Sequence, residues 1–325
     1  MSPSFRYLLK RLLLLLITML LVSFLTFLAF ELVSGDPART MLGTEATEAQ
    51  VAALQRQLGL DKPFPLRYFH WLVGFFSGDL GISYSYRQPV WDLISSKLAV
   101  TLWLSMISFI LITVISVPLG VLSYPLTGGF WDWPRTMLNQ LCMAIPPFFT
   151  GILVSWGFGI VLRLFTPGDF PGFQTDPAES LRHLFFGAVC LSIPRIAMTV
   201  RMLRSTVISE MNKAYVRTAI SRGNDRNSVL TRHVLKNSMV SVVTFLGQTL
   251  AELVGAGIVV EQVLGIPGLG RFLVLSISHR DYPVVQAIVV ILAFWVVLAG
   301  TAADLINQAI DPRLRLSARL GGAAG

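Results

Sequence analysis

The glycine-rich segment at 265–272 is the part of the sequence that comes nearest to a phosphate-binding loop. It reads GIPGLGRF, so it has two glycines at the required spacing, but Arg271 and Phe272 follow where lysine and then serine or threonine are needed. Without the lysine and the magnesium-binding hydroxyl, we expect this segment to bind no ATP. The sequence also lacks HExxH, GxSxG and CxxC motifs, so it predicts no catalytic residue and no enzyme.

The histidines and cysteines predict no metal site. Cys142 and Cys190 both lie in apolar runs, and the four histidines are widely separated, whereas metal ligands occur in closely spaced sets. We expect no bound metal and no cofactor, and we expect the histidines to lie at interfaces or on the surface. The histidines are His70, His183, His233 and His279.

Three carboxylates lie near or within apolar runs, where an ionisable group is costly and indicates a function. Glu31 and Asp304 fall at the ends of such runs, which is typical of residues that cap a span or reach the interface. Glu252 falls in the middle of one. It is either a structural partner for a neighbouring helix or a residue that lines a polar pathway, and the sequence leaves both readings open.

The composition is that of a membrane protein. Of the 325 residues, 54% are hydrophobic and 14% are charged, whereas soluble domains have about 25% charged residues. This excludes a disordered chain, a collagen-like fibre and a soluble enzyme. The net charge of +8 does not indicate nucleic-acid binding, because the basic residues cluster between apolar runs, as membrane orientation requires.

Six apolar runs are candidates for helices that cross a bilayer, which takes about 20 residues. These runs are 12–30, 98–124, 136–162, 184–200, 238–260 and 282–303. The fourth is short and contains Arg195. We accept it because the stretch from Arg195 to Lys236 holds nine Lys or Arg and two acidic residues, net +7. With six spans this stretch and the basic amino terminus both face the cytoplasm, as the positive-inside bias requires, and both termini lie inside.

This topology divides the chain into three regions. Residues 1–33 form the N-terminal tail and the first span, 34–97 form an extracytoplasmic segment, and 98–325 form a five-helix core. In the second region we expect a helix capped reciprocally by Thr47 and Gln50, because serine or threonine followed three positions later by glutamate or glutamine satisfies two helix-end donors.

The basic cytoplasmic segment is expected to form a pair of amphipathic helices. One helix is predicted over 211–222, where an apolar stripe runs from Met211 to Ala219. Gly223 is expected to end it at positive φ, and Asn224–Asp225 supply either a turn or the N-cap of a second short helix. Such a pair lies either on the lipid surface or in a groove of another protein, and the physics leaves both open.

This segment resembles the EAA loop of ABC-importer permeases, in which a small residue, a glycine and a helix start recur at fixed spacing. Here these positions are Ala219, Gly223 and His233, although Arg217 and Thr218 replace the commoner Glu and Ala. Further blocks resemble the peptide/nickel permease subfamily, in its order, over about residues 5–316. They read GDPA, LGLDKPF, FSGDLGISY, RQPV, YVRTAISRG, RHVLKNS, VVEQVLGIPGLGR, RDYPVVQA and DPRLR.

The resemblance implies an all-α membrane protein with the type I ABC-importer permease fold, six transmembrane helices and an extracytoplasmic insertion between the first two. Such a chain is a multi-pass protein of a bacterial or archaeal plasma (inner) membrane, with both termini cytoplasmic. It forms half of the pathway of an ATP-driven importer for peptides or a related small solute. Its implied partners are a homologous second permease subunit, two cytoplasmic ATP-binding subunits, an extracytoplasmic solute-binding protein and the lipid bilayer, but no nucleic acid.

The resemblance also implies site residues. It places coupling helices at about 205–237, which dock on the ATPase. Independently of the resemblance, the three glycines and Pro267 of the segment 265–271 predict a tight turn that packs beside the pathway, with Asp281 as a candidate partner for Arg271. The ATPase-coupling residues are Tyr215, Val216, Arg217, Ala219, Ile220, Arg222 and Gly223, and those of the pathway or gate are Glu252, Gly268, Gly270 and Arg271. The alternative is that the segment 265–271 is an ordinary connecting loop.

An ion-gradient-driven secondary carrier or channel is the alternative, but it would need more ionisable groups within the spans. The solute stays open among dipeptides, oligopeptides, glutathione and metal chelates such as that of nickel, because selection is expected in the binding protein.

Overall fold

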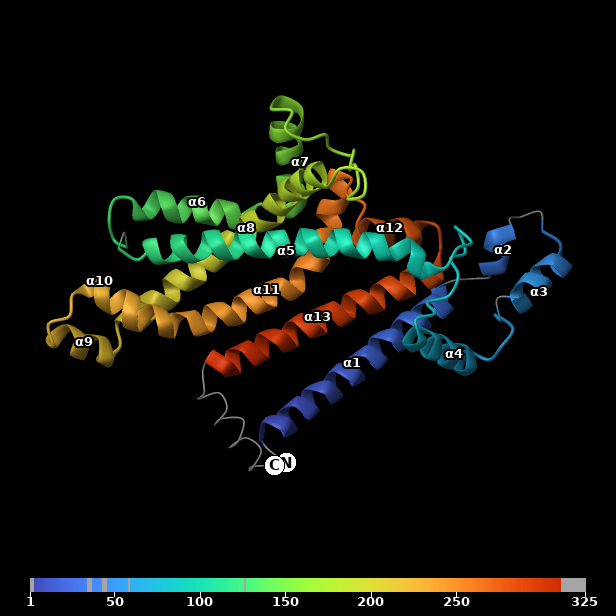
Figure 1. The fold of residues 1–325 in the computed structure, drawn as a ribbon, viewed down its shortest axis with the longest axis horizontal. Helices are drawn as coiled ribbons and strands as arrows, with labels where there is room; N and C mark the ends of the chain where they lie inside the picture. The colour runs from blue at the N-terminus through green and yellow to red at the C-terminus, as the bar shows by residue number, and fades with distance from the viewer. Residues whose placement is uncertain (1–2, 34–36, 43–45, 58, 126, 311–325) are drawn as a thin grey trace. The chain divides into compact units, whose positions relative to one another are not determined.

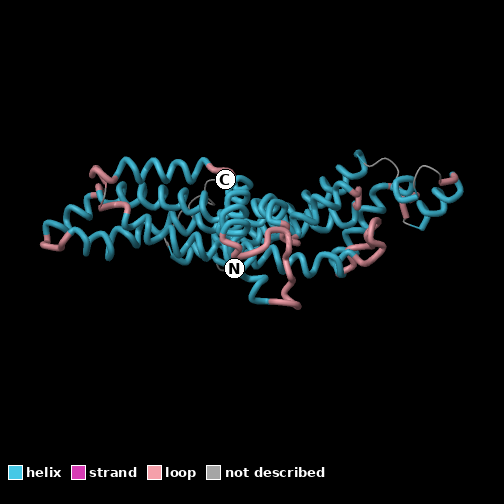
Figure 2. The backbone as a smooth tube through the Cα atoms, turned by 90° about the horizontal axis from the view of Figure 1, so that it is seen from above, coloured by secondary structure: helices cyan, strands magenta, loops and turns pink. Residues whose placement is uncertain are grey.

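The computed structural model describes residues 3–33, 37–42, 46–57, 59–125 and 127–310. This part of the chain is almost entirely helical (Figures 1 and 2), and its one β-type pairing is an isolated bridge between Ile82 and Pro89. The helices are α1 (Pro3–Val33), α2 (Pro37–Leu42), α3 (Glu48–Gln57), α4 (Phe64–Ser77), α5 (Val90–Leu122), α6 (Asp132–Ala144), α7 (Pro147–Val154), the π-helix η1 (Ser155–Val161), α8 (Pro177–Met211), α9 (Ala214–Ser221), α10 (Arg226–Val229), the π-helix η2 (Leu230–Val234), α11 (Leu235–Leu264), α12 (Leu269–Ser278) and α13 (Tyr282–Ile310).

Five helical stretches are long and apolar enough to cross a membrane. They contain the first, fourth, fifth and sixth predicted runs and all but the last two residues of the second, which ends at Leu122 rather than at residue 124. The doubtful fourth run lies within α8, whose 35 residues exceed the length that a span needs. The charge argument that favoured this span is therefore consistent with the structure.

The third predicted run is not one straight helix, and the prediction of a continuous span over 136–162 is wrong. The chain bends by 99° between α6 and the stretch Pro147–Val161, so it counts as a sixth span only as a bent pair. The cause is the Pro146–Pro147 pair. Neither proline has an N–H to continue the helix, and each disfavours helical geometry in the residue before it, so that Ile145 and Pro146 have ψ values of 119° and 147°.

The chain divides into two compact units, which are residues 1–101 with 267–295, and residues 102–266 with 296–325. In the second unit α8 is the central helix and contacts α6, α7 and α11. Its buried face includes Leu184, Leu191 and Leu203. A small residue permits close packing at Gly187, where an added Cβ would lie 2.9 Å from Ile266 and 3.1 Å from Leu104.

In the first unit, aromatic side chains join the end of α1 to α4. Phe27 makes edge contacts with Phe64 and Tyr68. Arg67 of α4 forms an ion pair with Glu31, so this carboxylate at the end of the first span is anchored by a helix of the outer segment.

Local capping chemistry in the outer segment follows the sequence. The backbone N–H of Thr47 donates to Gln50 Oε1 at 2.9 Å, and the N–H of Gln50 donates to Thr47 Oγ1 at 3.4 Å. The predicted reciprocal cap is confirmed.

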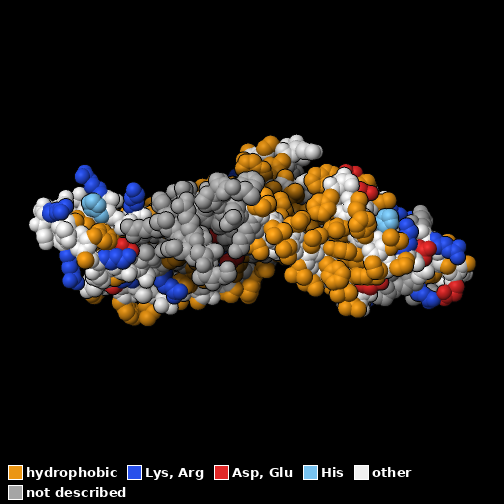
Figure 3. All heavy atoms as spheres, turned by 90° about the horizontal axis from the view of Figure 1, so that it is seen from below, with side chains coloured by type: hydrophobic (Ala, Val, Ile, Leu, Met, Phe, Trp, Pro, Cys, Tyr) orange, Lys and Arg blue, Asp and Glu red, His pale blue; other side chains and the backbone are white. Residues whose placement is uncertain are grey.

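The surface is rich in large apolar side chains. Hydrophobic side chains form continuous patches on the face drawn in Figure 3. Considered over all faces of the molecule, the exposed large apolar side chains include Leu13, Ile110, Leu138 and Ile160, each on a different helix. Soluble proteins rarely expose such patches, whereas helices that face lipid require them.

Candidate functional site

The short helix α9 is tied through Tyr215 to the long helices on either side of it. The Tyr215 hydroxyl donates to Glu210 Oε2, at the end of α8, at 2.8 Å, and it accepts from Asn237 Nδ2, near the start of α11, at 3.2 Å. Lys213 also donates to Glu210, and this hydrogen bond raises the pKa of the Lys213 ammonium. Burial raises the pKa of Tyr215. Both groups therefore keep their usual forms at neutral pH, and the Tyr215 hydroxyl joins α9 to both α8 and α11.

The residues predicted to contact an ATPase do not all face outward. Val216 is only 1% exposed, so it packs inside this chain and holds α9 in place. Tyr215 and Ala219 are half-buried. The exposed members of the set are Arg217, Ile220, Arg222 and Gly223.

The predicted helix over 211–222 begins too early. The helix α8 continues to Met211, whose side chain is buried, and α9 starts only at Ala214. The end of α9 follows the prediction, since Gly223 has φ 88°. The next helix also starts as predicted, because the Asp225 carboxylate accepts from the N–H of Ser228 at 2.9 Å.

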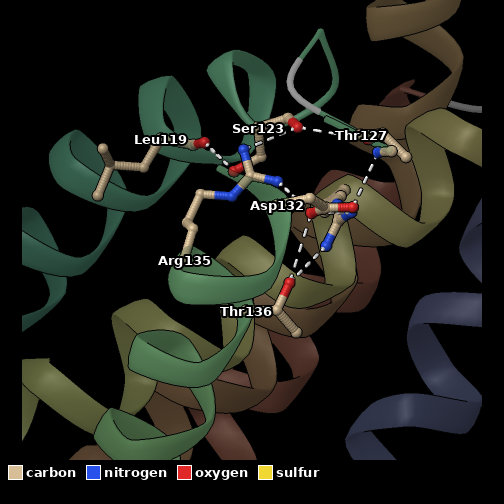
Figure 4. A network of polar contacts seen from close by, with 8 residues as sticks. Leu119, Ser123, Thr127, Asp132, Arg135 and Thr136 are labelled. Atoms are coloured by element: carbon tan, nitrogen blue, oxygen red, sulfur yellow. Dashed lines mark hydrogen bonds and ion pairs between the residues drawn. The ribbon is translucent and has the colours of Figure 1, made fainter. Parts of the chain in front are cut away.

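A second polar network surrounds Asp132, at the start of α6 (Figure 4). Asp132 Oδ1 accepts from Arg135 Nη2 at 2.8 Å and from Arg204 Nη2 of α8 at 2.6 Å, and Oδ2 accepts from the N–H of Gly128 at 2.9 Å. The other labelled residues in this view are Leu119, Ser123, Thr127 and Thr136. The network fixes the connection between α5 and α6 to α8.

A third link joins α10 to the connection that follows α5. Arg226 of α10 donates to the Tyr124 hydroxyl at 2.6 Å and lies over the Tyr124 ring. The connection that follows α5 is thus held both by α8 and by α10. In the sequence, Arg204 and Arg226 indicate only a basic segment, and neither contact could be predicted from it.

An ion pair joins the middle of α8 to the middle of α11. Arg195 Nη1 lies 2.6 Å from Glu252 Oε2, and the two side chains are 24% and 56% exposed. The sequence singled out both residues but did not pair them. The pair places the predicted pathway residue Glu252 next to a guanidinium of α8, and its exposure leaves it accessible from outside the chain.

The outer glycine-rich segment is part turn and part helix. Gly265 ends α11 at φ 71°, and an added Cβ would lie 2.6 Å from the Cα of Gly168. Gly268 then precedes α12, so the turn predicted over 265–271 ends at Gly268, and Leu269 to Arg271 already belong to a helix. Gly268 and Gly270 are buried and Arg271 is exposed.

Asp281 holds a hairpin of the outer segment. This fully buried carboxylate accepts from Ser83 Oγ at 2.5 Å and from the N–H groups of Tyr84 and Ser85 at 3.0 and 3.3 Å. Ser83 Oγ in turn accepts from the N–H of Tyr86 at 2.9 Å. The residue suggested as a partner for Arg271 therefore has a structural role of its own.

One histidine differs from the expectation. His183 is fully buried, with its ring against Phe165 and Phe170 and Nε2 3.4 Å from the Leu264 carbonyl. Among the described residues, no three His, Cys, Asp or Glu side chains lie close enough to hold a metal ion.

Comparison with known proteins assigns the family. The model of the "binding-protein-dependent transport system inner membrane component" family matches residues 116–316, and the model of the N-terminal part of such membrane components matches residues 4–105. The chain belongs to this family. Its relatives include a probable peptide ABC transporter permease of Sinorhizobium fredii, which is 33% identical over 309 residues, 95% of this chain and 99% of that protein.

Further relatives agree with this assignment. A glutathione transport system permease of Salmonella typhi is 34% identical over 309 residues, which are 95% of this chain and 98% of that protein. Among solved structures, the inward-facing MetNI methionine ABC transporter matches with a TM-score of 0.54 at 20% identity, over 67% of this chain and 96% of that chain. This likeness shows the type I importer permease fold.

The binding-protein-dependent permease is thus a multi-pass inner-membrane subunit of an ATP-driven importer. It is a transport component, not an enzyme, and works with ATPase and substrate-binding partners.

Proposed function

We propose that this permease forms one half of the translocation pathway of an importer for peptides or peptide-like solutes. The second half is a homologous permease chain, two ATP-binding subunits lie on the cytoplasmic side, and a solute-binding protein delivers the solute from outside. The names of the relatives support this solute class, since one belongs to a peptide system and another to a glutathione system, and glutathione is itself a small peptide.

The charge pattern supports the orientation. The connections that carry α9, α10 and the Asp132 network are rich in arginine, so they face the cytoplasm. Both termini then lie on that side as well, and the hairpin around Ser83 lies outside. The bilayer surrounds the apolar faces of the long helices.

The observation that carries the coupling role is the double anchorage of α9. Its inner side is fixed by Val216 and Tyr215, and its outer side presents Ile220 and Arg217 to a partner. When ATP binding moves the partner's surface, α9 moves with it. The hydrogen bonds of Tyr215 then transmit the displacement to α8 and α11, which open or close the pathway.

The test uses two variants of α9 in the assembled complex. Ile220→Asp places a charge on the exposed side, and Gly223→Val forces a side chain into φ 88° where space is open, so its effect comes from the backbone alone. We expect membrane insertion to be unchanged, while co-purification of the ATPase and ATP-dependent uptake fall about tenfold, a loss of about 1.4 kcal/mol of docking free energy.

The matched control is Arg56→Glu, an equally exposed change on α3 of the outer segment, which should alter neither quantity. Normal ATPase retention and normal uptake in both α9 variants would exclude α9 as the docking element.

A further inference from the structure

Arg195 and Glu252, which form an ion pair, both lie within predicted apolar runs, 184–200 and 238–260. Arg195 is 5 residues from the end of its run, and Glu252 is 14 and 8 residues from the two ends of its own. At 1.5 Å per residue, this puts the backbone of Glu252 about 21 Å and about 12 Å from the ends of its run. A pair at this depth with a half-exposed carboxylate cannot face lipid without a large cost, so it faces water or another protein chain.

The surroundings of Glu252 on α11 favour water. The exposed positions Gln248, Glu252 and Gly255 fall at i, i+4 and i+7 and form one stripe. The stripe is polar beside the carboxylate, and no atom lies within 4 Å of a Cβ added at Gly255. Over 296–306, the part of α13 in the same unit whose side chains are described, the exposed residues are apolar instead, among them Val296 and Leu298, as contact with lipid requires. The chain therefore has a polar face on α11 and an apolar face on α13.

The chemistry of the pair suggests which group it meets. A guanidinium binds carboxylates in a planar fork and stays charged at any physiological pH. Its resting partner is itself a carboxylate, and that partner is half-exposed and so can be displaced. We propose that Arg195 is a transit site for the carboxylate group of the solute, and that Glu252 is the counter-ion which this group replaces and which then returns.

This proposal rests on the proposed function, because it needs the polar stripe of α11 to line the pathway. The counter-ion explains how such a site permits passage. An unpaired arginine at this depth would be costly when empty and would retain an anion when occupied. Competition from Glu252 keeps the affinity low enough for release, as conduction through a pore requires.

The experiment compares trialanine with its C-terminal amide, which lacks the carboxylate. Uptake of both is measured in proteoliposomes that contain the whole complex, with a solute-binding protein that calorimetry has shown to bind both forms. Because the same binding protein serves every variant, its own preference cancels when the acid-to-amide ratio of uptake is compared between variants. The variants are Arg195→Gln, Arg195→Lys, Glu252→Gln and, as the control, Arg201→Gln, which changes an exposed arginine on the same helix.

We expect Arg195→Gln to lower the acid-to-amide ratio about tenfold, Arg195→Lys to lower it less, and Arg201→Gln to leave it unchanged. Glu252→Gln removes the competitor, so it should lower both KM and kcat for the acid and neither for the amide.

A wild-type ratio in Arg195→Gln, or an equal loss for acid and amide, overturns the proposal and makes the pair structural. If the wild-type complex shows no ATP-dependent uptake of either form, the proposed peptide function fails and the transit site fails with it.

Discussion

Replacing Asp281 by asparagine should release the hairpin that contains Ser83. Asparagine keeps the shape of the side chain but replaces one of its two acceptor oxygens with a donor group. Asp281 Oδ2 accepts from Ser83 Oγ and from the N–H of Ser85, while Oδ1 accepts from the N–H of Tyr84. The variant therefore loses the charge and up to two of the three hydrogen bonds.

The expected magnitude follows from the burial of these contacts. Hydrogen bonds to a charged group contribute about 1.5–3 kcal/mol each, and a buried donor left without a partner costs a similar amount. Because one acceptor oxygen remains, we expect the free energy of opening the hairpin to fall by about 2–3 kcal/mol. At about 1.4 kcal/mol for each factor of ten, the open population rises about 30- to 150-fold.

Trypsin cleavage after Arg87 measures this opening. Arg87 is exposed but lies in the folded hairpin at φ 56°, so cleavage requires local opening, and its rate follows the open population when reclosing is fast. The purified protein is treated with dilute trypsin and the fragment that ends at Arg87 is quantified by mass spectrometry.

The control is Asp79→Asn just before the same hairpin, where an exposed carboxylate accepts from the N–H of Gly81. Asparagine can keep this bond, so the rate should change less than about threefold, or about 0.7 kcal/mol. If Asp281→Asn accelerates cleavage no more than Asp79→Asn does, the buried carboxylate is not what holds the hairpin.

Two further predictions concern the outer side of the molecule. Gly265→Ala should lower the unfolding temperature, because the new Cβ meets the backbone of Gly168 at 2.6 Å and the φ of residue 265 is 71°. The control Gly255→Ala, which has open space around the new Cβ, should not lower it. Equal unfolding temperatures of the two variants would contradict this. Burial, with a smaller contribution from Asp281, raises the pKa of Tyr84 from 10.0 to about 12, so the folded form keeps this proton where the unfolded chain loses it. The stability that this group contributes is complete below pH 10 and is lost as the pH rises from 10 through 12. Absorbance at 295 nm should show one tyrosine titrating near pH 12 that Tyr84→Phe removes, and its absence from the wild type would refute the assignment.

Features decided by near neighbours in the chain were predictable from the sequence. The caps at Thr47 and Asp225 and the positive φ of Gly223 depend on a few adjacent residues. The spans depend on hydropathy and on the side that carries basic residues, so even the weak fourth run was identified.

Features decided by packing between distant segments were not predictable. The pairs Arg195–Glu252 and Asp132–Arg204 join residues far apart in the chain, and only the approach of the helices brings them together. The burial of Val216 was missed for the same reason, since an apolar residue on an amphipathic helix fits either its own protein or a partner equally well.

The bend between α6 and α7 has a consequence for where water enters the membrane. In a continuous helix, the carbonyls of Cys142 and Met143 would accept from the N–H groups four residues ahead, but those residues are Pro146 and Pro147 and have none. Two backbone oxygens inside an apolar run thus lack their helical donors, and hydrocarbon supplies no replacement. The bend must be hydrated or covered by polar groups, so the third crossing is the place to look for water within the apolar region. The half-exposed thiol of Cys142 lies at this point and provides a natural reporter of that water.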